Sequence, residues 1–323
     1  MELNISKQET LFIKGMAILF VILSHMGLFD CGGVIGVHLF LIISGYGIYC
    51  SYEKHGKRSY WKRRVSSVYM PYLFVMLILF ALRLVIYNNN NISWKNILVT
   101  ILGLDFNLNI DPTMWYISYI FSCYFIAWGI FQIQSYKKKT WLAPIFGVSC
   151  FFIITACGYK HIIWHQGTNV WAYGLSFPLG MLMARFRMEK RKIFLTLKKM
   201  LVILSGGGVI FLLKVQHVSW IKFLFTLSTA VIILIICGCL FKYKKDNIII
   251  QPILNIGKYS YFMYLNEAFV IGCIQKIIPS EGKMQNYSMQ IMTTVLVIVT
   301  SYILAVGFNK LYKKASDMVI KMD

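Results

Sequence analysis

The sequence has no long polar stretch and is poor in acidic residues. Aspartate and glutamate together number 12 against 33 lysines and arginines, and charged residues make up only 14% of the 323-residue chain. Hydrophobic residues make up 58%, and the mean hydropathy is +0.64. This composition excludes a soluble globular protein, and the missing polar block excludes a separate soluble domain. We therefore expect residues 1–323 to form one all-α, polytopic membrane domain.

The sequence also lacks the features of a signal peptide, a metal site and a nucleic-acid-binding protein. The start of the chain lacks the basic region, short apolar core and cleavage site of a signal peptide, so no cleaved leader is expected. The eight cysteines lie within or beside apolar runs, where cysteine packs as a small hydrophobic residue, and no metal site is expected. The net charge of +21 is divided into short basic clusters between apolar runs. That distribution is typical of membrane topology and argues against nucleic acid as a partner.

Ten apolar runs are candidate membrane-spanning helices. They cover about residues 11–29, 34–52, 67–87, 113–134, 141–158, 168–185, 200–215, 219–241, 259–277 and 289–310. With the N-terminus in the cytoplasm, alternate loops place 25 of the 33 basic residues inside and seven outside, with Lys14 within the first run. This bias predicts ten crossings with both termini cytoplasmic. The run 97–104 is too short to cross and is expected to be re-entrant or interfacial.

The first apolar run, LFIKGMAILFVILSHMGLF, contains two ionisable residues, Lys14 and His25. Eleven residues at about 100° each complete roughly three turns, so both side chains lie on one helix face about 16 Å apart. A charge in hydrocarbon costs roughly 2.5–3.5 kcal/mol, so such residues are functional candidates. His38 begins the next run, near the end that carries His25. A snorkelling lysine and a histidine that packs between helices are the structural alternatives.

These two runs resemble the opening of the integral-membrane acyltransferase 3 family. That family begins with Arg-Gly-x-Ala and a histidine, with ten residues between the arginine and the histidine. This chain has Lys-Gly-Met-Ala at 14–17 and then His25, so lysine replaces arginine. The family continues with Gly-Val-Asp-Leu-Phe and Ser-Gly-Phe or Ser-Gly-Tyr. Here the first motif reads GVHLF, with His38 in place of the aspartate, and the second is SGY, beginning at Ser44.

A basic loop, YEKHGKRSYWKRRVSSVYMPY, follows the second run. It is similar to a family stretch in which basic residues precede a further arginine and then a proline near a tyrosine. Arg63, Arg64, Pro71 and Tyr72 match this stretch, and Ser67 stands where the further arginine is expected. The two arginines are suited to holding phosphate groups by bidentate contacts. Topology and contact with anionic lipids are the alternative role of the loop.

A third segment, MWYIS, contains Trp115 and Tyr116 and is similar to the family's Trp-Tyr-Ile motif. It lies on the predicted outer side, shortly after Asp111. These three residues are therefore candidates for the acceptor side. An aromatic belt at the membrane interface is the alternative reading of the two aromatic residues.

The fourth segment, IGKYSYFMYL at 256–265, is similar to the family's Leu-Gly-Lys-x-Ser-Tyr-x-x-Tyr-Leu. Relatives often carry a histidine after it, whereas this chain has an asparagine and then Glu267. An acidic residue inside an apolar run is expected to face the protein interior and to be paired. Lys14 and Lys276 are its candidate partners, and the sequence does not decide between them.

The resemblance implies an O-acyltransferase in the cytoplasmic membrane of a bacterium. An acyl-coenzyme A, usually acetyl-coenzyme A, is the donor inside, and a hydroxyl of a surface glycan or glycolipid is the acceptor outside. Lys14, Arg63 and Arg64 are expected to bind the donor. His25 is expected to act as general base or to carry the acyl group covalently, with His38 as a second catalytic candidate. No resident cofactor is expected.

Two other classes of function fit the same composition. A glycolipid flippase or polymerase would also be polytopic, but it would not require the pairing of Lys14 and His25 or the Ser-Gly-Tyr segment. A proton-coupled transporter could use His25, His38 and Glu267 as a relay. Its uptake would depend on pH and it would not consume acyl-coenzyme A, which separates it from the enzyme.

The charge bias makes a direct prediction about topology. A cysteine introduced at Lys190, in the predicted inner loop 185–199, should be inaccessible to a membrane-impermeant thiol reagent added to intact cells. The same cysteine should react once the membrane is made permeable. Labelling in intact cells would contradict the predicted orientation.

Overall fold

The computed structural model describes residues 5–87, 93–104, 111, 113–137, 173–188, 219–243, 250–278 and 287–322. The regular structure of these residues is helical throughout, which confirms the all-α prediction. The helices are, in chain order, α1 (Lys7–His25), α2 (Gly32–His55), α3 (Tyr60–Arg64), η1 (Val65–Tyr69), α4 (Met70–Tyr87), α5 (Trp94–Ile101), α6 (Trp115–Lys137), α8 (Ser176–Met188), α10 (Ser219–Tyr243), α11 (Ile250–Ile277) and α12 (Tyr287–Met322).

Several of these helices have the length and apolarity of membrane spans. Five segments of the described chain qualify: Lys7–His25, Gly32–His55, Tyr60–Arg83, Trp115–Ile133 and Tyr287–Met318. The predicted spans at 11–29, 34–52, 67–87, 113–134, 219–241, 259–277 and 289–310 each coincide with a helix, and α8 covers part of 168–185. The predicted spans at 141–158 and 200–215 lie outside the described residues. Ten crossings with cytoplasmic termini therefore stay a prediction.

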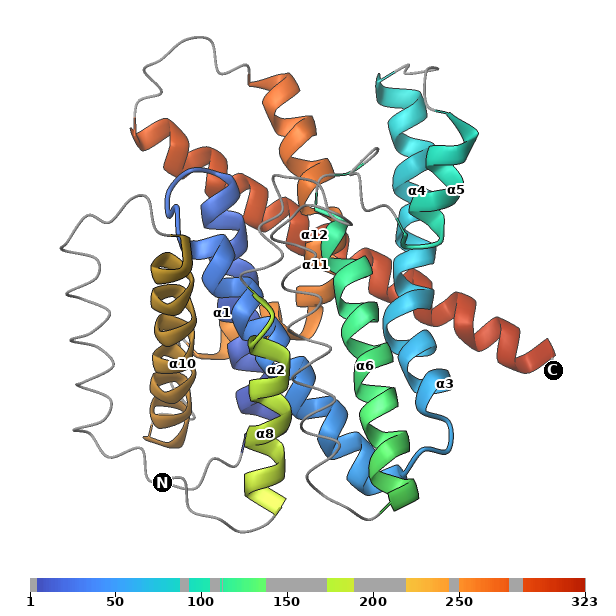
Figure 1. Ribbon diagram of the computed structural model, residues 1–323. Coiled ribbons are helices and arrows are strands. Elements are labelled where there is room, and N and C mark those ends of the chain that lie inside the picture. Colours follow the sequence, from blue (N-terminus) through green and yellow to red (C-terminus); the bar gives the residue numbers. More distant parts are fainter. Residues whose placement is uncertain are drawn as a thin grey trace.

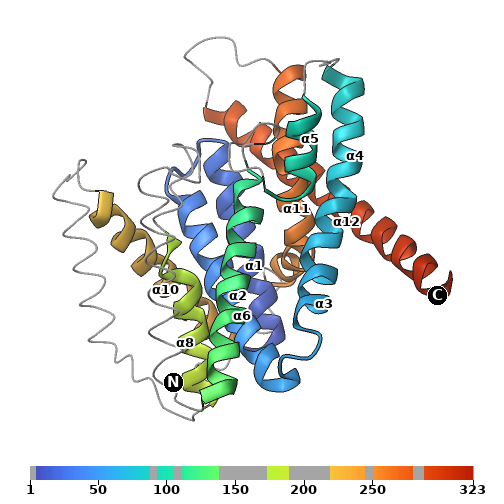
Figure 2. The ribbon, with the colours of Figure 1, turned by 45° about the vertical axis from the view of Figure 1, so that its right-hand side comes forward.

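Helices α1 and α2 form the centre of the bundle. α1 packs against α2, α10, α11 and α12, while α2 also packs against α8 and α10. Both ribbon views place α10 at one edge and the rod of α3 and α4 at the opposite edge (Figures 1 and 2). α12 crosses the bundle obliquely, and its C-terminal end extends past α4 in both views. The central pair thus contacts most of the bundle.

Glycines let the central helices touch through their backbones. A Cβ atom added at Gly257 of α11 would collide with the Leu11 carbonyl of α1, and one at Gly36 of α2 would collide with the Ala17 carbonyl. The same holds for Gly180 of α8 against α2. Helices in a membrane gain little from burying apolar side chains against each other, so close approach at small residues is a main source of their association. These contacts fix α2 and α11 against α1, and α8 against α2.

The rod of α3 and α4 contains η1, a turn of π-helix. A π-turn accommodates one extra residue and often marks a functional site. Two carbonyls of η1 accept hydrogen bonds from other helices. The Tyr261 hydroxyl donates to the Val68 carbonyl at 2.8 Å, and the Tyr312 hydroxyl donates to the Ser66 carbonyl at 3.2 Å. The irregular turn is therefore held by α11 and α12.

Helix α5 is short, and its C-terminal end bonds to both α4 and α6. The Tyr72 hydroxyl of α4 donates to the Thr100 carbonyl, and the Ser118 hydroxyl of α6 donates to the Gly103 carbonyl at 2.7 Å. Gly103 has φ +70°, a left-handed conformation that glycine adopts readily at a helix end. Thr100 is 2% exposed while Trp94 is 84% exposed. The C-terminal end of α5 is therefore inserted into the protein, and the re-entrant or interfacial position of 97–104 in the membrane stays a prediction.

The glycine contacts predict which substitutions destabilise the fold. Gly257→Ala should lower the free energy of unfolding by roughly 1–3 kcal/mol, because its methyl group overlaps the α1 backbone. Gly307→Ala in α12 is the matched control, since an added Cβ there meets no atom of the described chain within 4 Å. It should be neutral or slightly stabilising, because alanine favours helix over glycine. Thermal unfolding of the two purified variants in detergent measures both; equal stabilities would contradict the close contact.

Candidate functional site

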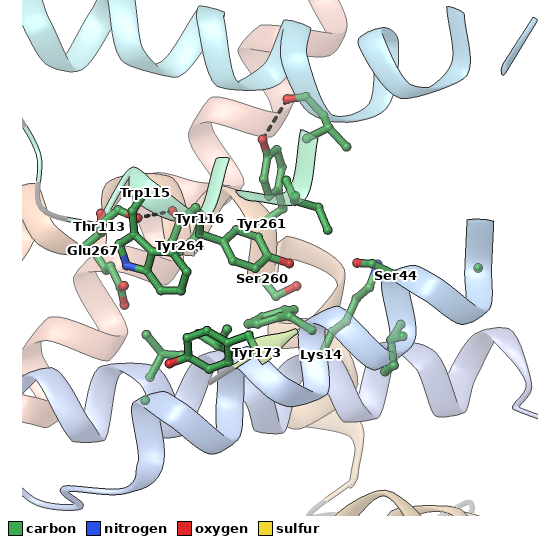
Figure 3. Close-up of a pocket in the computed structure, with 18 of the residues that line it drawn as sticks. Lys14, Ser44, Thr113, Trp115, Tyr116, Tyr173, Ser260, Tyr261, Tyr264 and Glu267 are labelled. Carbon is green, nitrogen blue, oxygen red and sulfur yellow. Dashed lines mark hydrogen bonds between the residues drawn. The ribbon is translucent and has the colours of Figure 1, made fainter. Parts of the chain in front are cut away.

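A cavity of about 610 Å³ lies between α1, α2, α6, α11 and the first part of the rod, α3 and η1. It brings together side chains far apart in the sequence, and Figure 3 shows part of its lining. Seven of the residues singled out from the sequence line it: Lys14, His25, Ser44, Arg64, Trp115, Tyr116 and Glu267. His38, Arg63 and Asp111 are not among its lining residues.

The cavity extends along α1 from Thr10 to His25. At 1.5 Å per residue this stretch of helix is about 22 Å long. Figure 3 shows Lys14 and Ser44 toward one end and Trp115 and Glu267 toward the other. The predicted single face of Lys14 and His25 is therefore a wall of one continuous cavity. Its two ends have different chemistry.

One end holds a histidine–carboxyl pair, His25 and Glu267. The His25 Nδ1 atom lies 3.3 Å from the Glu267 Oε1 atom. The His25 side chain is 40% exposed, whereas that of Glu267 is 0% exposed. Neither Glu267 oxygen accepts a hydrogen bond from any other described residue. The carboxylate is thus directed at the imidazole, and the remaining ring nitrogen of His25 is left for a ligand.

This pair resolves the question of the partner of Glu267. The sequence left Lys14 and Lys276 as candidates, and the structure pairs Glu267 with His25 instead. The reason is the packing of α11 against α1, which brings the two residues together across 242 positions in the sequence. Helix spacing alone does not contain this information.

The other end of the cavity is cationic. Lys14 from α1 and Arg64 from α3 both line it and are close enough for their charges to interact. The Arg64 guanidinium carbon lies 5.8 Å from the centre of the Tyr124 ring, a cation–π distance. Ser67, at the position of the family's further arginine, also lines the cavity and is exposed. Two cations therefore converge on this end.

Arg63 has a different environment from its neighbour. Its guanidinium donates to the Arg58 carbonyl and to the Ser59 hydroxyl, both at 2.9 Å, and to the Gly56 carbonyl at 3.4 Å. These bonds close the turn between α2 and α3. The structure thus separates two arginines that the sequence treated as one site.

His38 lies against α8. It is 0% exposed, and its Nδ1 atom is 2.6 Å from the Ser176 hydroxyl oxygen. Its ring packs edge-on against Tyr173 with centroids 5.1 Å apart. His38 was expected to approach His25 across the turn between α1 and α2. The carboxylate beside His25 comes instead from Glu267, and the catalytic role of His38 stays a prediction.

Asp111 precedes α6, and Trp115 is its first residue. Asp111 is 1% exposed, and an Arg83 nitrogen lies 2.6 Å from its Oδ2 atom. Its other oxygen accepts hydrogen bonds from the backbone and hydroxyl of Thr113. Trp115 lines the cavity and stacks on Tyr173, with centroids 5.4 Å apart and an interplanar angle of 19°. Asp111 thus anchors the segment that presents Trp115 to the cavity.

Tyrosines form much of the wall between the two ends, and none of them except Tyr116 was named from the sequence as a site residue, although Tyr261 and Tyr264 belong to the fourth family segment. Those that line the cavity, besides Tyr116, are Tyr124, Tyr173, Tyr261 and Tyr264. A signal for two of them was present, because Tyr261, Tyr264 and Glu267 recur every three residues and so share a helix face. The Tyr264 hydroxyl donates to the Thr113 carbonyl, which joins α11 to the start of α6.

The comparison with protein families agrees with this arrangement. The acyltransferase 3 family model, described as an acyltransferase domain, matches residues 12–310. The chain belongs to this family. No curated protein and no solved structure matches the chain. Together with its apolar helices, the match makes this protein a membrane acyltransferase.

The expectation that the two arginines bind an acyl-coenzyme A donor, together with their different settings, makes a prediction. Arg64→Ala should weaken the binding of coenzyme A about tenfold, because a charged contact at the cavity is lost. Arg63→Ala should have a smaller effect, because its side chain is occupied by the turn after α2. Calorimetric titration of coenzyme A into each purified variant measures both, with Arg64→Lys as the charge-preserving control. A larger loss in Arg63→Ala would reverse the assignment.

Proposed function

We propose that the protein transfers an acyl group, most simply acetyl, from cytoplasmic acyl-coenzyme A to a hydroxyl of an extracytoplasmic glycan or glycolipid. The observation that carries this proposal is the single cavity that joins a cationic end, with Lys14 and Arg64, to the His25–Glu267 pair. A transferase acting across a membrane needs such a path between donor and acceptor. The proposed location is the bacterial cell membrane.

The cationic end is suited to the donor. The phosphates of coenzyme A carry negative charge, and arginine and lysine bind phosphate through charge-assisted hydrogen bonds. Lys14 and His25 are about 16 Å apart along α1. A donor anchored at Lys14 and Arg64 therefore needs an extended arm to bring its thioester to His25. The donor is a substrate, and the reaction needs no resident cofactor.

The His25–Glu267 pair is suited to general base catalysis. In the proposed step, the acceptor hydroxyl gives its proton to the free nitrogen of His25 as its oxygen attacks the thioester carbonyl. The carbon–sulfur bond then breaks, and the thiolate leaves and is protonated by the imidazolium. Glu267 holds the ring by its Nδ1 atom and stabilises its positive charge. A base in this position typically accelerates a reaction about 10²–10⁴-fold.

The acceptor is proposed to bind beside Trp115 and Tyr116, at the His25 end of the cavity. Trp115 presents an aromatic surface there, backed by Tyr173. Asp111 supports this surface through the start of α6, since its oxygens bond to Arg83 and Thr113. An effect of Asp111 on the acceptor would therefore be transmitted through Trp115.

One experiment tests both the reaction and the role of His25. Proton NMR of surface polysaccharide should show an O-acetyl signal in cells that carry the protein and none in cells that lack it. His25→Gln should remove the signal, because glutamine keeps a hydrogen bond but cannot accept and return a proton. A packing histidine would tolerate this change.

The control is the same histidine-to-glutamine substitution at a position outside the cavity. His55→Gln, in the exposed last turn of α2, should keep the O-acetyl signal at equal expression. A normal signal from His25→Gln would return His25 to a structural role. No signal from wild-type cells, together with pH-dependent solute uptake, would instead favour a transporter.

A further inference from the structure

Gly47 stands within α2 and has no structural reason to be glycine. Glycine in a helix interior destabilises the helix relative to alanine, because it loses more backbone freedom on folding. A glycine kept at such a position therefore needs an explanation. Gly47 is exposed, has ordinary helical neighbours and lines the large cavity.

Helix packing explains other glycines of α2 but not this one. A Cβ added at Gly45, two positions earlier, would overlap the Phe177 carbonyl of α8, and one at Gly36 would overlap the Ala17 carbonyl of α1. Among the described residues, a Cβ added at Gly47 meets no atom within 4 Å. The space beside Gly47 is open, and it belongs to the cavity.

The register of α1 and α2 places Gly47 at the cationic end. The two helices are antiparallel, since Gly33 lies beside Ser24 and Gly36 lies beside Val21. Continued along the helices, this register puts Gly47 opposite Thr10, one turn beyond Lys14, and both residues line the cavity. Gly47 is therefore at the cationic end of the cavity, where the proposed donor binds. Because Gly47 is exposed there, this end is called the entrance.

A second small residue stands at the same entrance. Ser67 of η1 also lines the cavity and is exposed. Its hydroxyl donates to the Arg63 carbonyl at 2.6 Å, so the side chain is folded back onto its own helix. Arg64, three positions before Ser67, also lines the cavity and supplies positive charge. The entrance thus combines charge with two positions that leave space open.

We propose that Gly47 is a specificity-determining residue: the phosphopantetheine chain of the donor enters the cavity across the bare backbone of α2 at this position. The inference rests on the proposed function, because it takes the donor to be an acyl-coenzyme A. The charged nucleotide part stays at the entrance with Lys14 and Arg64, and only the slender chain passes inward. A side chain at position 47 would project into the path of the donor.

The experiment separates passage from folding. Gly47→Leu should raise the KM for acetyl-coenzyme A at least tenfold in the full-length protein in nanodiscs, with little change in thermal stability. Gly47→Ala should be at least as stable as wild type and should raise the KM by a smaller factor. The steady-state rate is followed as release of coenzyme A thiol with a glycan acceptor present.

Gly307→Leu is the matched control. Gly307 is also a helical glycine whose added Cβ meets no atom of any residue that the structure describes within 4 Å, and it does not line the cavity. Its KM should stay within twofold of the wild-type value. A KM within twofold for Gly47→Leu would overturn the inference, and so would a lower stability of Gly47→Ala, which would show that the glycine is structural.

A binding measurement distinguishes failure of this inference from failure of the proposed function. Gly47→Cys should react with a small maleimide, and coenzyme A should slow that reaction at least fivefold, whereas a Gly307→Cys variant should show no such protection. If wild type consumes acetyl-coenzyme A but Gly47→Cys is not protected, only the entry path is wrong. If wild type neither binds coenzyme A nor consumes the donor, the proposed function fails and the inference falls with it.

Discussion

Direct contact between helix backbones is the constraint on which the rest of the structure depends. α1 is held between α2 and α11 at glycines that leave no room for a side chain, including Gly36 and Gly257. One of the facing helices carries Glu267, and α1 carries His25. The 3.3 Å separation of their side chains therefore depends on how closely α1 and α11 approach. Small residues distant from the chemistry set the geometry of the site.

The cavity explains how polar groups are accommodated inside an apolar bundle. Ionisable residues within a membrane are costly unless they face an interior space or a partner. Lys14 and Arg64 face the cavity, and Glu267 faces both the cavity and His25. Tyrosines line much of the wall between them, and their hydroxyls reach backbone carbonyls of η1 and of the start of α6. The cavity is lined by polar groups, and the packed helices around it are apolar.

Sequence reasoning predicts features that depend on one helix and misses those that depend on two. The all-α class, the positions of seven described helices and the shared face of Lys14 and His25 follow from local pattern. The partner of Glu267 and the separation of Arg63 from Arg64 depend on packing and on a turn between helices. His38 illustrates the same limit, because its contact with Ser176 joins residues 138 positions apart. Its place in the family motif suggested a role beside His25.

The extra residue in η1 sets how the side chains of α3 are rotated about the helix axis relative to those of α4. Each residue of an α-helix rotates the chain by about 100°, and a π-turn absorbs one residue without that rotation. Arg64 therefore occupies the angular position that Val65 would hold in an unbroken α-helix leading to α4. With regular winding, the entrance to the cavity would present an isopropyl group in place of a guanidinium. Both the winding of the backbone and the residue type therefore determine that the Arg64 cation lines the cavity.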